Sequence, residues 1–225
     1  MRILIGGEKG GCGKSTLATN LVVALRLAGR DALLLDADGQ RTSAKWAERR
    51  AVSEIVPAVP CTEKRDDLKA VVRELGSRYQ DLIVDAGGRD SRELRSALLV
   101  VDLALFPLRP SQADLETVPH LSELLQLARS LRENGAPLAG LVLSMAPTHY
   151  LVSEARDAAN MLETLPDFVL AEAVIRERKV YRDALLSGRS VLEMDNETAH
   201  FEMCRLIKEI SNGAIQIPVA RRDAA

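Results

Sequence analysis

A glycine-rich segment close to the N-terminus, EKGGCGKST at residues 8–16, constrains the fold more than any other feature of the sequence. A β-rich apolar segment from Arg2 to Gly6 precedes it, and a helical pattern begins near Lys14. This order of strand, loop and helix is the setting of a P-loop, whose backbone N–H groups bind phosphate. We therefore expect a nucleotide-binding protein built around a β-sheet.

Short apolar segments alternate with amphipathic helical patterns along the rest of the chain. Further strands are predicted over 31–38, 56–61, 81–88, 103–111, 138–147 and 167–175. Helices are predicted over 18–29, 43–50, 66–79, 116–135 and 153–165, with two more in the C-terminal part. Strands that are apolar throughout and separated by helices form a parallel sheet covered on both faces. The sequence thus predicts a doubly wound α/β fold with a mainly parallel sheet, of the P-loop NTPase type.

Length and composition favour one globular domain. The 225 residues contain no repeat or dividing linker, so we expect a single domain over 1–215 and a C-terminal tail over 216–225. The apolar runs end well before the roughly 20 residues that a membrane span needs. Cys12, Cys61 and Cys204 form no CxxC pair, which favours reduced thiols in a cytoplasmic protein over disulfides or a zinc site.

Each residue type in the glycine-rich segment has a chemical reason to be there. The glycines at 10, 11 and 13 let backbone N–H groups converge on phosphate, together with those of Cys12 and Thr16. The Lys14 ammonium reaches the terminal phosphates, and the Ser15 hydroxyl is a ligand for Mg²⁺. Glu8 stands where the general pattern GxxxxGK[ST] has glycine. Its charge is expected to weaken triphosphate binding unless it points outward or pairs with a lysine.

Three carboxylates follow predicted strands. Asp36 and Asp38 end the segment LLLDAD, and Asp85 ends DLIVDAGG. Because ligands bind outside the carboxyl ends of parallel strands, all three are expected near the same phosphates. Asp36 and Asp85 are placed to hold Mg²⁺ directly or through water, and Asp38 to orient or deprotonate an attacking water. Gly87 and Gly88 give the next turn the freedom of a switch that responds to the γ-phosphate.

These motifs resemble the ParA/MinD family of ATPases, which carry a deviant P-loop, xKGGxGK[ST]. The likeness extends through the segments DADGQRTSAKW, DLIVDAGGRDSRELR, PLRPSQADLET and RERKVYRDALLSGRSVLE, and so covers nearly the whole chain. Two positions depart from the family pattern. Gly39 replaces the usual proline, and Ser144 stands where many relatives have asparagine near the base. No residue is therefore assigned to adenine recognition.

The resemblance implies a specific activity. Family members bind ATP and Mg²⁺ as a homodimer, and the additional lysine of the loop, here Lys9, reaches the nucleotide of the partner subunit. A partner protein, such as a ParB-type adaptor, stimulates hydrolysis, and the ATP-bound dimer occupies a surface, either nucleoid DNA or membrane. The chain resembles the small partition ATPases that lack an N-terminal helix-turn-helix. Two alternatives remain, a MinD-like membrane-associated positioning ATPase and a biosynthetic enzyme resembling dethiobiotin synthetase.

DNA is the preferred surface because one segment is locally basic. Residues 176–189 hold five basic and two acidic side chains, a balance of +3, although the whole chain has a net charge of −2. The basic residues are Arg176, Arg178, Lys179, Arg182 and Arg189. A C-terminal apolar stripe is expected to pack against the sheet rather than a membrane. It consists of Phe201, Cys204, Ile207 and Ile210. His120, His149 and His200 are given no catalytic role.

Overall fold

The computed structural model describes residues 1–88, 91–132, 137–149, 154–162, 165–213 and 215. Within them, seven parallel strands form one sheet in the order β3-β2-β4-β1-β5-β6-β7. The strands are β1 (Arg2–Ile5), β2 (Ala32–Ala37), β3 (Cys61–Glu63), β4 (Asp81–Ala86), β5 (Leu103–Leu108), β6 (Leu138–Leu143) and β7 (Val169–Leu170). The doubly wound parallel fold predicted from the sequence is confirmed.

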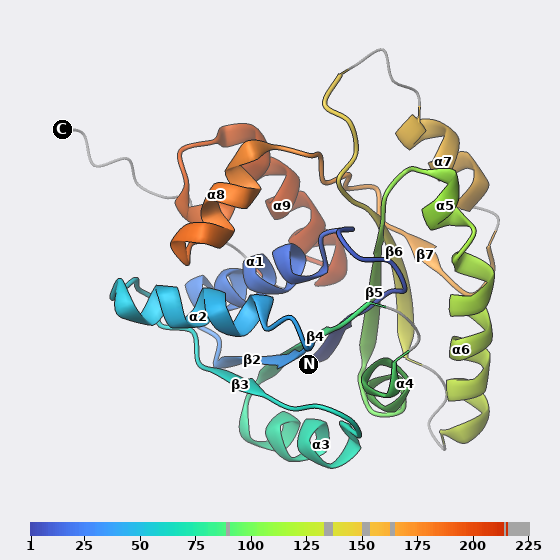
Figure 1. Cartoon of the computed structure of the whole chain (residues 1–225), viewed down its shortest axis with the longest axis horizontal. Coiled ribbons are helices and arrows are strands. Elements are labelled where there is room, and N and C mark those ends of the chain that lie inside the picture. Colours follow the sequence, from blue (N-terminus) through green and yellow to red (C-terminus); the bar gives the residue numbers. More distant parts are fainter. Residues whose placement is uncertain (89–90, 133–136, 150–153, 163–164, 214, 216–225) are drawn as a thin grey trace.

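Helices connect successive strands and cover both faces of the sheet (Figure 1). Those of one face are α1 (Lys14–Leu27), α2 (Thr42–Val52), α8 (Lys179–Ser187) and α9 (Glu197–Ile210). Those of the other are α3 (Lys69–Arg78), α4 (Arg92–Leu98), α6 (Val118–Leu131) and α7 (Glu154–Leu162). Two short helical segments, α5 (Gln112–Leu115) and η1 (Val191–Glu193), complete the set.

The period of two along each strand divides the core between these faces. In β1, Ile3 and Ile5 pack with the α1 side, whereas Leu4 packs with the α4 side. Both sets are fully buried, which explains why the strands are apolar at every position. Trp46 of α2 is also fully buried, and its indole N–H donates to the carbonyl of Arg189 at 2.9 Å. This bond ties α2 to the segment after α8.

Three elements differ from the sequence-based predictions. The prediction missed α4, which has only seven residues and is capped by the Ser91 hydroxyl. Strand β3 begins only at Cys61, where the segment 56–61 was predicted. Strand β7 pairs over two residues rather than nine. Its pairing is interrupted because the Glu209 carboxylate of α9 accepts the N–H groups of Glu172 and Ala173.

The prediction of the C-terminal apolar stripe is also partly wrong. Phe201 is 66% exposed, whereas Ile207 of the predicted stripe is buried, together with Met203 and Leu206, which the stripe did not include. The helix packs on the α1 side of the sheet, as expected, but is rotated relative to the predicted stripe. The proposed tail, 216–225, lies outside the described residues. Among the helices that the structure describes, none is long and apolar enough to cross a membrane.

Candidate functional site

The glycine-rich loop connects β1 to α1 at the carboxyl edge of the sheet. Gly11 and Gly13 have φ angles of 73° and 91°, in the left-handed region that favours glycine. A Cβ atom on Gly13 would also lie 2.7 Å from the Ser144 hydroxyl, so a larger residue does not fit there. Gly13 is the N-cap of α1 and contributes no side-chain cap. The first N–H groups of α1 are therefore available to an anion.

The two lysines of the loop occupy different environments. Lys14 is 6% exposed, and its ammonium donates to the carbonyl of Lys9 within the loop. Cys12 is buried, with its thiol 3.7 Å from that ammonium, and burial raises its pKa. Lys9, in contrast, is exposed, and its ammonium forms no hydrogen bond or ion pair with a described residue. One cation is thus built into the loop, and the other extends from it.

Arg109, at the end of β5, supports the loop from the side. Its Nε and Nη2 atoms donate to the carbonyl of Gly11 at 3.1 and 2.7 Å. Two N–H groups on one carbonyl fix the plane of that peptide, and with it the direction of the neighbouring N–H groups. The sequence analysis gave Arg109 no role. Its position just after a strand, like those of the three aspartates, was the available signal.

Glu8 pairs with a histidine rather than a lysine. Its Oε1 atom lies 3.4 Å from Nε2 of His120 in α6, and the other ring nitrogen lies 3.2 Å from Glu123. Protonated imidazole can donate to both carboxylates at once. His120 lines the same cavity as the loop, although the sequence analysis gave it no functional role. When it is protonated, the His120 imidazole compensates the unusual Glu8 charge.

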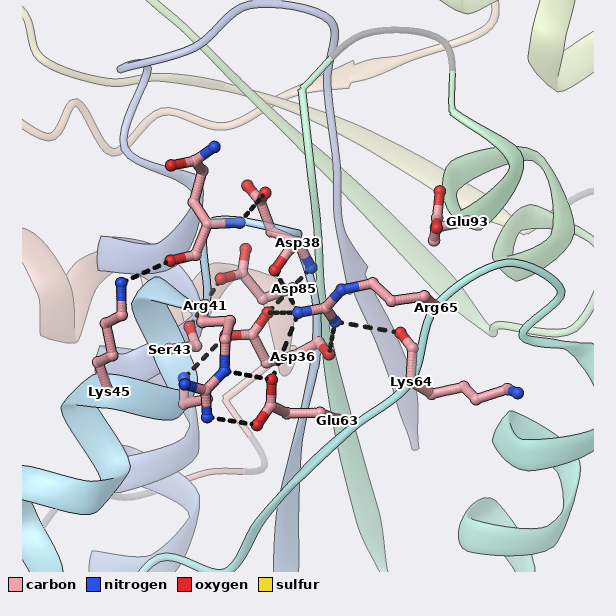
Figure 2. A network of polar contacts seen from close by, with 12 residues as sticks. Asp36, Asp38, Arg41, Ser43, Lys45, Glu63, Lys64, Arg65, Asp85 and Glu93 are labelled. Carbon is pink, nitrogen blue, oxygen red and sulfur yellow. Dashed lines mark hydrogen bonds and ion pairs between the residues drawn. The ribbon is translucent and has the colours of Figure 1, made fainter.

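Asp36 holds the turn that follows β2 (Figure 2). It is fully buried, and its two oxygens accept the N–H groups of Asp38 at 2.9 Å and Ala44 at 2.8 Å. Burial raises its pKa, and these hydrogen bonds act in the opposite direction. The carboxylate thereby joins the end of β2 to the start of α2. In this geometry it shapes the turn that carries Asp38, and its predicted role in holding Mg²⁺ directly or through water stays a prediction.

Asp85 has the free oxygen that a metal site requires. It lies beside Asp36 on the neighbouring strand and is fully buried. Its Oδ2 accepts from the Ser43 hydroxyl at 2.6 Å, whereas its Oδ1 is buried without a hydrogen-bond partner among the described residues. Burial raises the pKa of Asp85 to about 7, while the Ser43 and Ser15 hydroxyls lower it. Carboxylate and hydroxyl oxygens suit Mg²⁺, so Asp85 and the Ser15 hydroxyl fit the ion.

Asp38 sits between the P-loop and the turn after β4. Its Oδ1 accepts the N–H of Gln40 at 2.9 Å. A Cβ atom on Gly88 would lie 3.3 Å from the Glu8 carbonyl, so the backbone of this turn runs close to the P-loop. The two turns and the P-loop therefore meet at one place. The switch expected at Gly87 and Gly88 stays a prediction.

A cavity of about 1120 Å³ opens above these groups, slightly larger than the roughly 300–1,000 Å³ of typical small-molecule sites. The predicted residues that line it are Lys9, Gly10, Gly11, Gly13, Lys14, Ser15, Thr16, Asp38 and Gly88. The remaining predicted residues, Cys12, Asp36, Asp85 and Gly87, do not line it. Among the described residues, no cluster of three or more His, Cys, Asp or Glu could hold a metal ion. A Mg²⁺ here would need phosphate oxygens and water to complete its ligands.

The five basic residues of segment 176–189 do not line this cavity, although Leu185 of the same segment does, and most of their charge is paired. Arg178 bonds to Glu202 at 2.7 Å, Lys179 to Asp183 at 2.8 Å and Arg182 to Glu177 at 3.2 Å. The Arg176 side chain donates to the carbonyl of Pro147. Arg189 is exposed and forms no ion pair with a described residue. The segment is thus less cationic in the fold than its composition indicates.

Two further cations belong to α2, the helix that contacts Arg189. The backbone of Arg189 contacts Trp46 of α2, as described above. Lys45 and Arg49, on either side of Trp46 in the sequence, are exposed, and among the described residues they donate only to the backbone carbonyls of Gln40 and Leu185. The free positive charge of this face therefore comes from both α2 and the end of α8.

Comparison with known proteins extends these observations. The model of the CobQ/CobB/MinD/ParA nucleotide binding domain matches residues 3–191. The carboxysome distribution protein A of Gloeobacter kilaueensis is 31% identical over 194 residues, covering 85% of this chain and 83% of that protein. Its counterpart in Halothiobacillus neapolitanus is 26% identical over 211 residues, covering 92% and 95%.

Solved structures show the same fold at lower identity. An ATP complex of a Cyanothece McdA variant has a TM-score of 0.73 and 17% identity, covering 94% of this chain and 96% of that one. MinD of Pyrococcus horikoshii with Mg-ADP has a TM-score of 0.66 and 18% identity, covering 93% and 95%. The family model and the Gloeobacter relative confirm the resemblance seen in the motifs. The chain belongs to the CobQ/CobB/MinD/ParA nucleotide-binding family, as a small ATPase of the ParA/MinD type.

Proposed function

We propose that the chain dimerises on binding ATP, binds DNA without sequence preference, and hydrolyses ATP when a partner protein stimulates it. The cycle would position or partition a cargo such as a plasmid, a chromosomal locus or a carboxysome. The observation that carries this proposal is the contrast between the two loop lysines. Lys14 is buried within its own P-loop, whereas Lys9 is exposed and has no described partner. An exposed cation at this position is available to the triphosphate of a second subunit.

The chain's own residues would divide the chemistry among them. The N–H groups at the start of α1 and the Lys14 ammonium bind the β- and γ-phosphates. Ser15 and Asp85 hold Mg²⁺, which neutralises charge on the phosphates when bound. Asp38 orients the attacking water, and Lys9 of the partner subunit stabilises the charge that develops during phosphoryl transfer. Each group is at the carboxyl edge of the sheet, where such ligands bind.

Separate replacement of the two loop lysines by alanine tests whether ATP binding drives dimerisation. Lys9→Ala is expected to abolish ATP-driven dimerisation and stimulated turnover while ATP still binds, since Lys14 remains. Lys14→Ala is expected to lose ATP binding itself. Light scattering after size exclusion, with ATP or ADP, measures the mass, and a fluorescent ATP analogue measures binding. Full turnover by the Lys9→Ala protein, or a monomer at saturating ATP in the wild type, contradicts the proposal. Lys64→Ala, which removes another exposed lysine, is the matched control.

Nonspecific DNA is the surface that the free cations favour. A dimer would present Lys45, Arg49 and Arg189 twice, and DNA affinity rises with each phosphate neutralised. We expect the double variant Arg49→Ala/Arg189→Ala to lose most of its ATP-dependent DNA binding and to show a shallower salt dependence. Lys179→Ala, which removes a lysine already paired with Asp183, should change it little. Electrophoretic mobility shifts over a range of salt concentrations measure both.

Two other functions make different predictions. A MinD-like membrane ATPase would sediment with anionic liposomes in the presence of ATP and would ignore DNA. A biosynthetic enzyme of the dethiobiotin synthetase type would couple ATP turnover to a small-molecule acceptor. The partner is proposed to be a ParB-type or other DNA-bound adaptor, and the protein to be cytoplasmic and nucleoid-associated. Turnover stimulated by DNA and adaptor, without an acceptor, favours the partition role.

A further inference from the structure

We propose that Arg65 is a positioning residue for ATP hydrolysis, which fixes the turn that carries Asp38 and connects it to α4. The inference rests on the proposed ATPase function and adds to it a residue outside the recognised motifs. Arg65 lies in the segment just after β3 and does not line the nucleotide cavity. Its side chain points to the turn after β2, toward Asp36 and Asp38 (Figure 2).

The guanidinium of Arg65 donates hydrogen bonds to two backbone carbonyls of that turn. Its Nη1 donates to the carbonyl of Asp36 at 2.6 Å, and its Nη2 donates to the carbonyl of Asp38. A planar fork that binds two carbonyls fixes their relative orientation, which a single flexible donor cannot do. The fork thus holds the backbone from which the Asp38 side chain extends, while the Gln40 N–H donates to the carboxylate itself at 2.9 Å. The Nη2 atom also lies 3.8 Å from the Asp36 carboxylate, whose pKa is raised by burial, and the Arg65 charge partly offsets that rise.

The position of Arg65 follows from the end of the sheet. The pairing of β3 with β2 ends when the N–H of Lys64 donates to the carbonyl of Asp36 at 3.2 Å. Beyond this point the turn after β2 has no strand beside it on the β3 side. Arg65 supplies hydrogen bonds from its side chain where the backbone ladder stops. Without it, the turn would keep the bonds from Asp36 to α2 but lose its outer support.

The same segment reaches α4, the helix after the proposed switch. The N–H of Asp66 donates to Glu93 Oε1 at 2.8 Å, and the N–H of Leu68 donates to the Ser96 hydroxyl at 2.9 Å. Glu93 and Ser96 belong to the first and second turns of α4. Residues 65–68 therefore contact both the turn that carries Asp38 and the helix that follows Gly88. A shift of α4 on γ-phosphate binding would be transmitted to Asp38 through them.

A purely electrostatic role for Arg65 is less consistent with the contacts. Its distance to Glu63 is 3.4 Å, but Glu63 already forms a closer pair with Arg41 at 2.7 Å. Exposed pairs of this kind contribute little to stability. The two carbonyls are the shorter contacts, and they lead to Asp38. The fork, and not the charge alone, is therefore the feature to test.

Arg65→Gln and Arg65→Lys separate the fork from the charge. We expect both to lower kcat for ATP about 10- to 100-fold, because small misplacement of a catalytic group has effects of this size. The dissociation constant of Mg-ATP and the melting temperature should stay close to wild type. Lys64→Ala, at the adjacent exposed lysine, should behave as wild type. Single-turnover hydrolysis and fluorescent ATP binding give the two quantities separately.

The coupling to α4 is tested with Glu93→Gln. If residues 65–68 link the two elements, its effect on kcat should be much smaller in the Arg65→Gln background than in the wild type. Full turnover in Arg65→Lys, or a loss of kcat explained entirely by weaker ATP binding or lower stability, would overturn the inference. A wild-type protein that binds but never hydrolyses ATP would instead refute the proposed ATPase function. The two failures are thus distinguishable.

Discussion

Gly87 packs directly against the carboxylate of Asp38: a Cβ atom on Gly87 would lie 3.2 Å from Cγ of Asp38 and 3.3 Å from its Oδ1. Contacts this short force the neighbour to move by a few tenths of an ångström. We predict that Gly87→Ala lowers the rate of ATP hydrolysis about 10-fold or more, since it displaces the proposed catalytic carboxylate. Nucleotide affinity should change by less than about 3-fold, because the P-loop is untouched. Single-turnover assays and ATP titrations measure the two effects.

Gly39 offers the matched control. It lies in the same turn as Asp38, but a Cβ atom there would meet nothing within 4 Å. Gly39→Ala is therefore expected to leave turnover near the wild-type rate. Equal losses in the two variants would show that the contact with Asp38 is not the cause.

The pair formed by Glu8 and His120 predicts opposite effects on ATP affinity. Glu8→Gln removes a negative charge from the cavity and should tighten ATP binding about 3- to 10-fold. His120→Gln leaves that charge uncompensated and should weaken binding by a similar factor. In the Glu8→Gln background, His120→Gln should change ATP affinity little further, because His120 affects that affinity by offsetting the Glu8 charge. Isothermal titration with Mg-ATP measures all four combinations.

Glu123→Gln provides the comparison for this cycle. Glu123 also contacts His120, but its side chain is 75% exposed and it does not line the cavity. Its substitution should change ATP affinity by less than about 2-fold. If His120→Gln is as harmful without the Glu8 charge as with it, the compensation model is wrong.

We predict that loss of Arg109 weakens ATP binding more than it lowers the maximal rate of hydrolysis. Arg109→Ala removes two hydrogen bonds from the carbonyl of Gly11 and should weaken ATP binding about 10-fold, since the loop must then be ordered by the ligand. The rate at saturating ATP should fall much less. Arg129→Ala, which removes an exposed pair with Asp167, is a suitable control. A lower maximal rate with unchanged ATP affinity would be inconsistent with a role in shaping the loop.

We predict that replacing Asp85 by the neutral asparagine stabilises the fold, and more so at higher pH. The pKa of Asp85 is raised by burial to about 7 in the folded state, against about 3.9 in an unfolded chain. Between these values the unfolded chain releases a proton that the folded chain keeps, so the free energy of unfolding falls as pH rises toward 7. Asp85→Asn cannot ionise and avoids this loss. Its melting temperature should exceed that of the wild type, and by more at pH 8 than at pH 5.

This experiment is done without Mg²⁺ and nucleotide, because a bound cation would stabilise the charged carboxylate. Differential scanning fluorimetry gives the melting temperatures, with Asp183→Asn, an exposed pair partner, as the control. A stability difference that is the same at both pH values would argue against a buried, ionising Asp85. The same variant is expected to lose Mg²⁺-dependent turnover.

The sequence predicted those parts of the site that lie close together along the chain. The P-loop and the three aspartates carry local patterns, because strand, glycine turn and helix follow one another within a few residues. Helix α4 was missed because its seven residues are too few for a clear amphipathic period. The paired state of Arg178 was also out of reach, since its partner Glu202 belongs to a different helix.

Residues that support the site from a distance left no such pattern. His120, Arg109 and Arg65 each reach the site from a separate segment, and Arg109 contacts a residue 98 positions away. An arginine or histidine in a loop has many uses, so only the folded arrangement shows which atoms it meets. The fold class could be predicted because alternation is repeated along the chain, whereas these single long-range contacts are not repeated anywhere.

The buried Trp46 gives the protein an intrinsic fluorescent probe. The chain contains one tryptophan, and that indole is buried in the core on the α1 side, where it donates to the carbonyl of Arg189. Helix α2 is also the element whose first turn is tied to Asp36 through Ala44. Any rearrangement of that turn which moves α2 would alter the surroundings of a single fluorophore. Nucleotide-driven motion can therefore be followed by intrinsic emission, with no label attached.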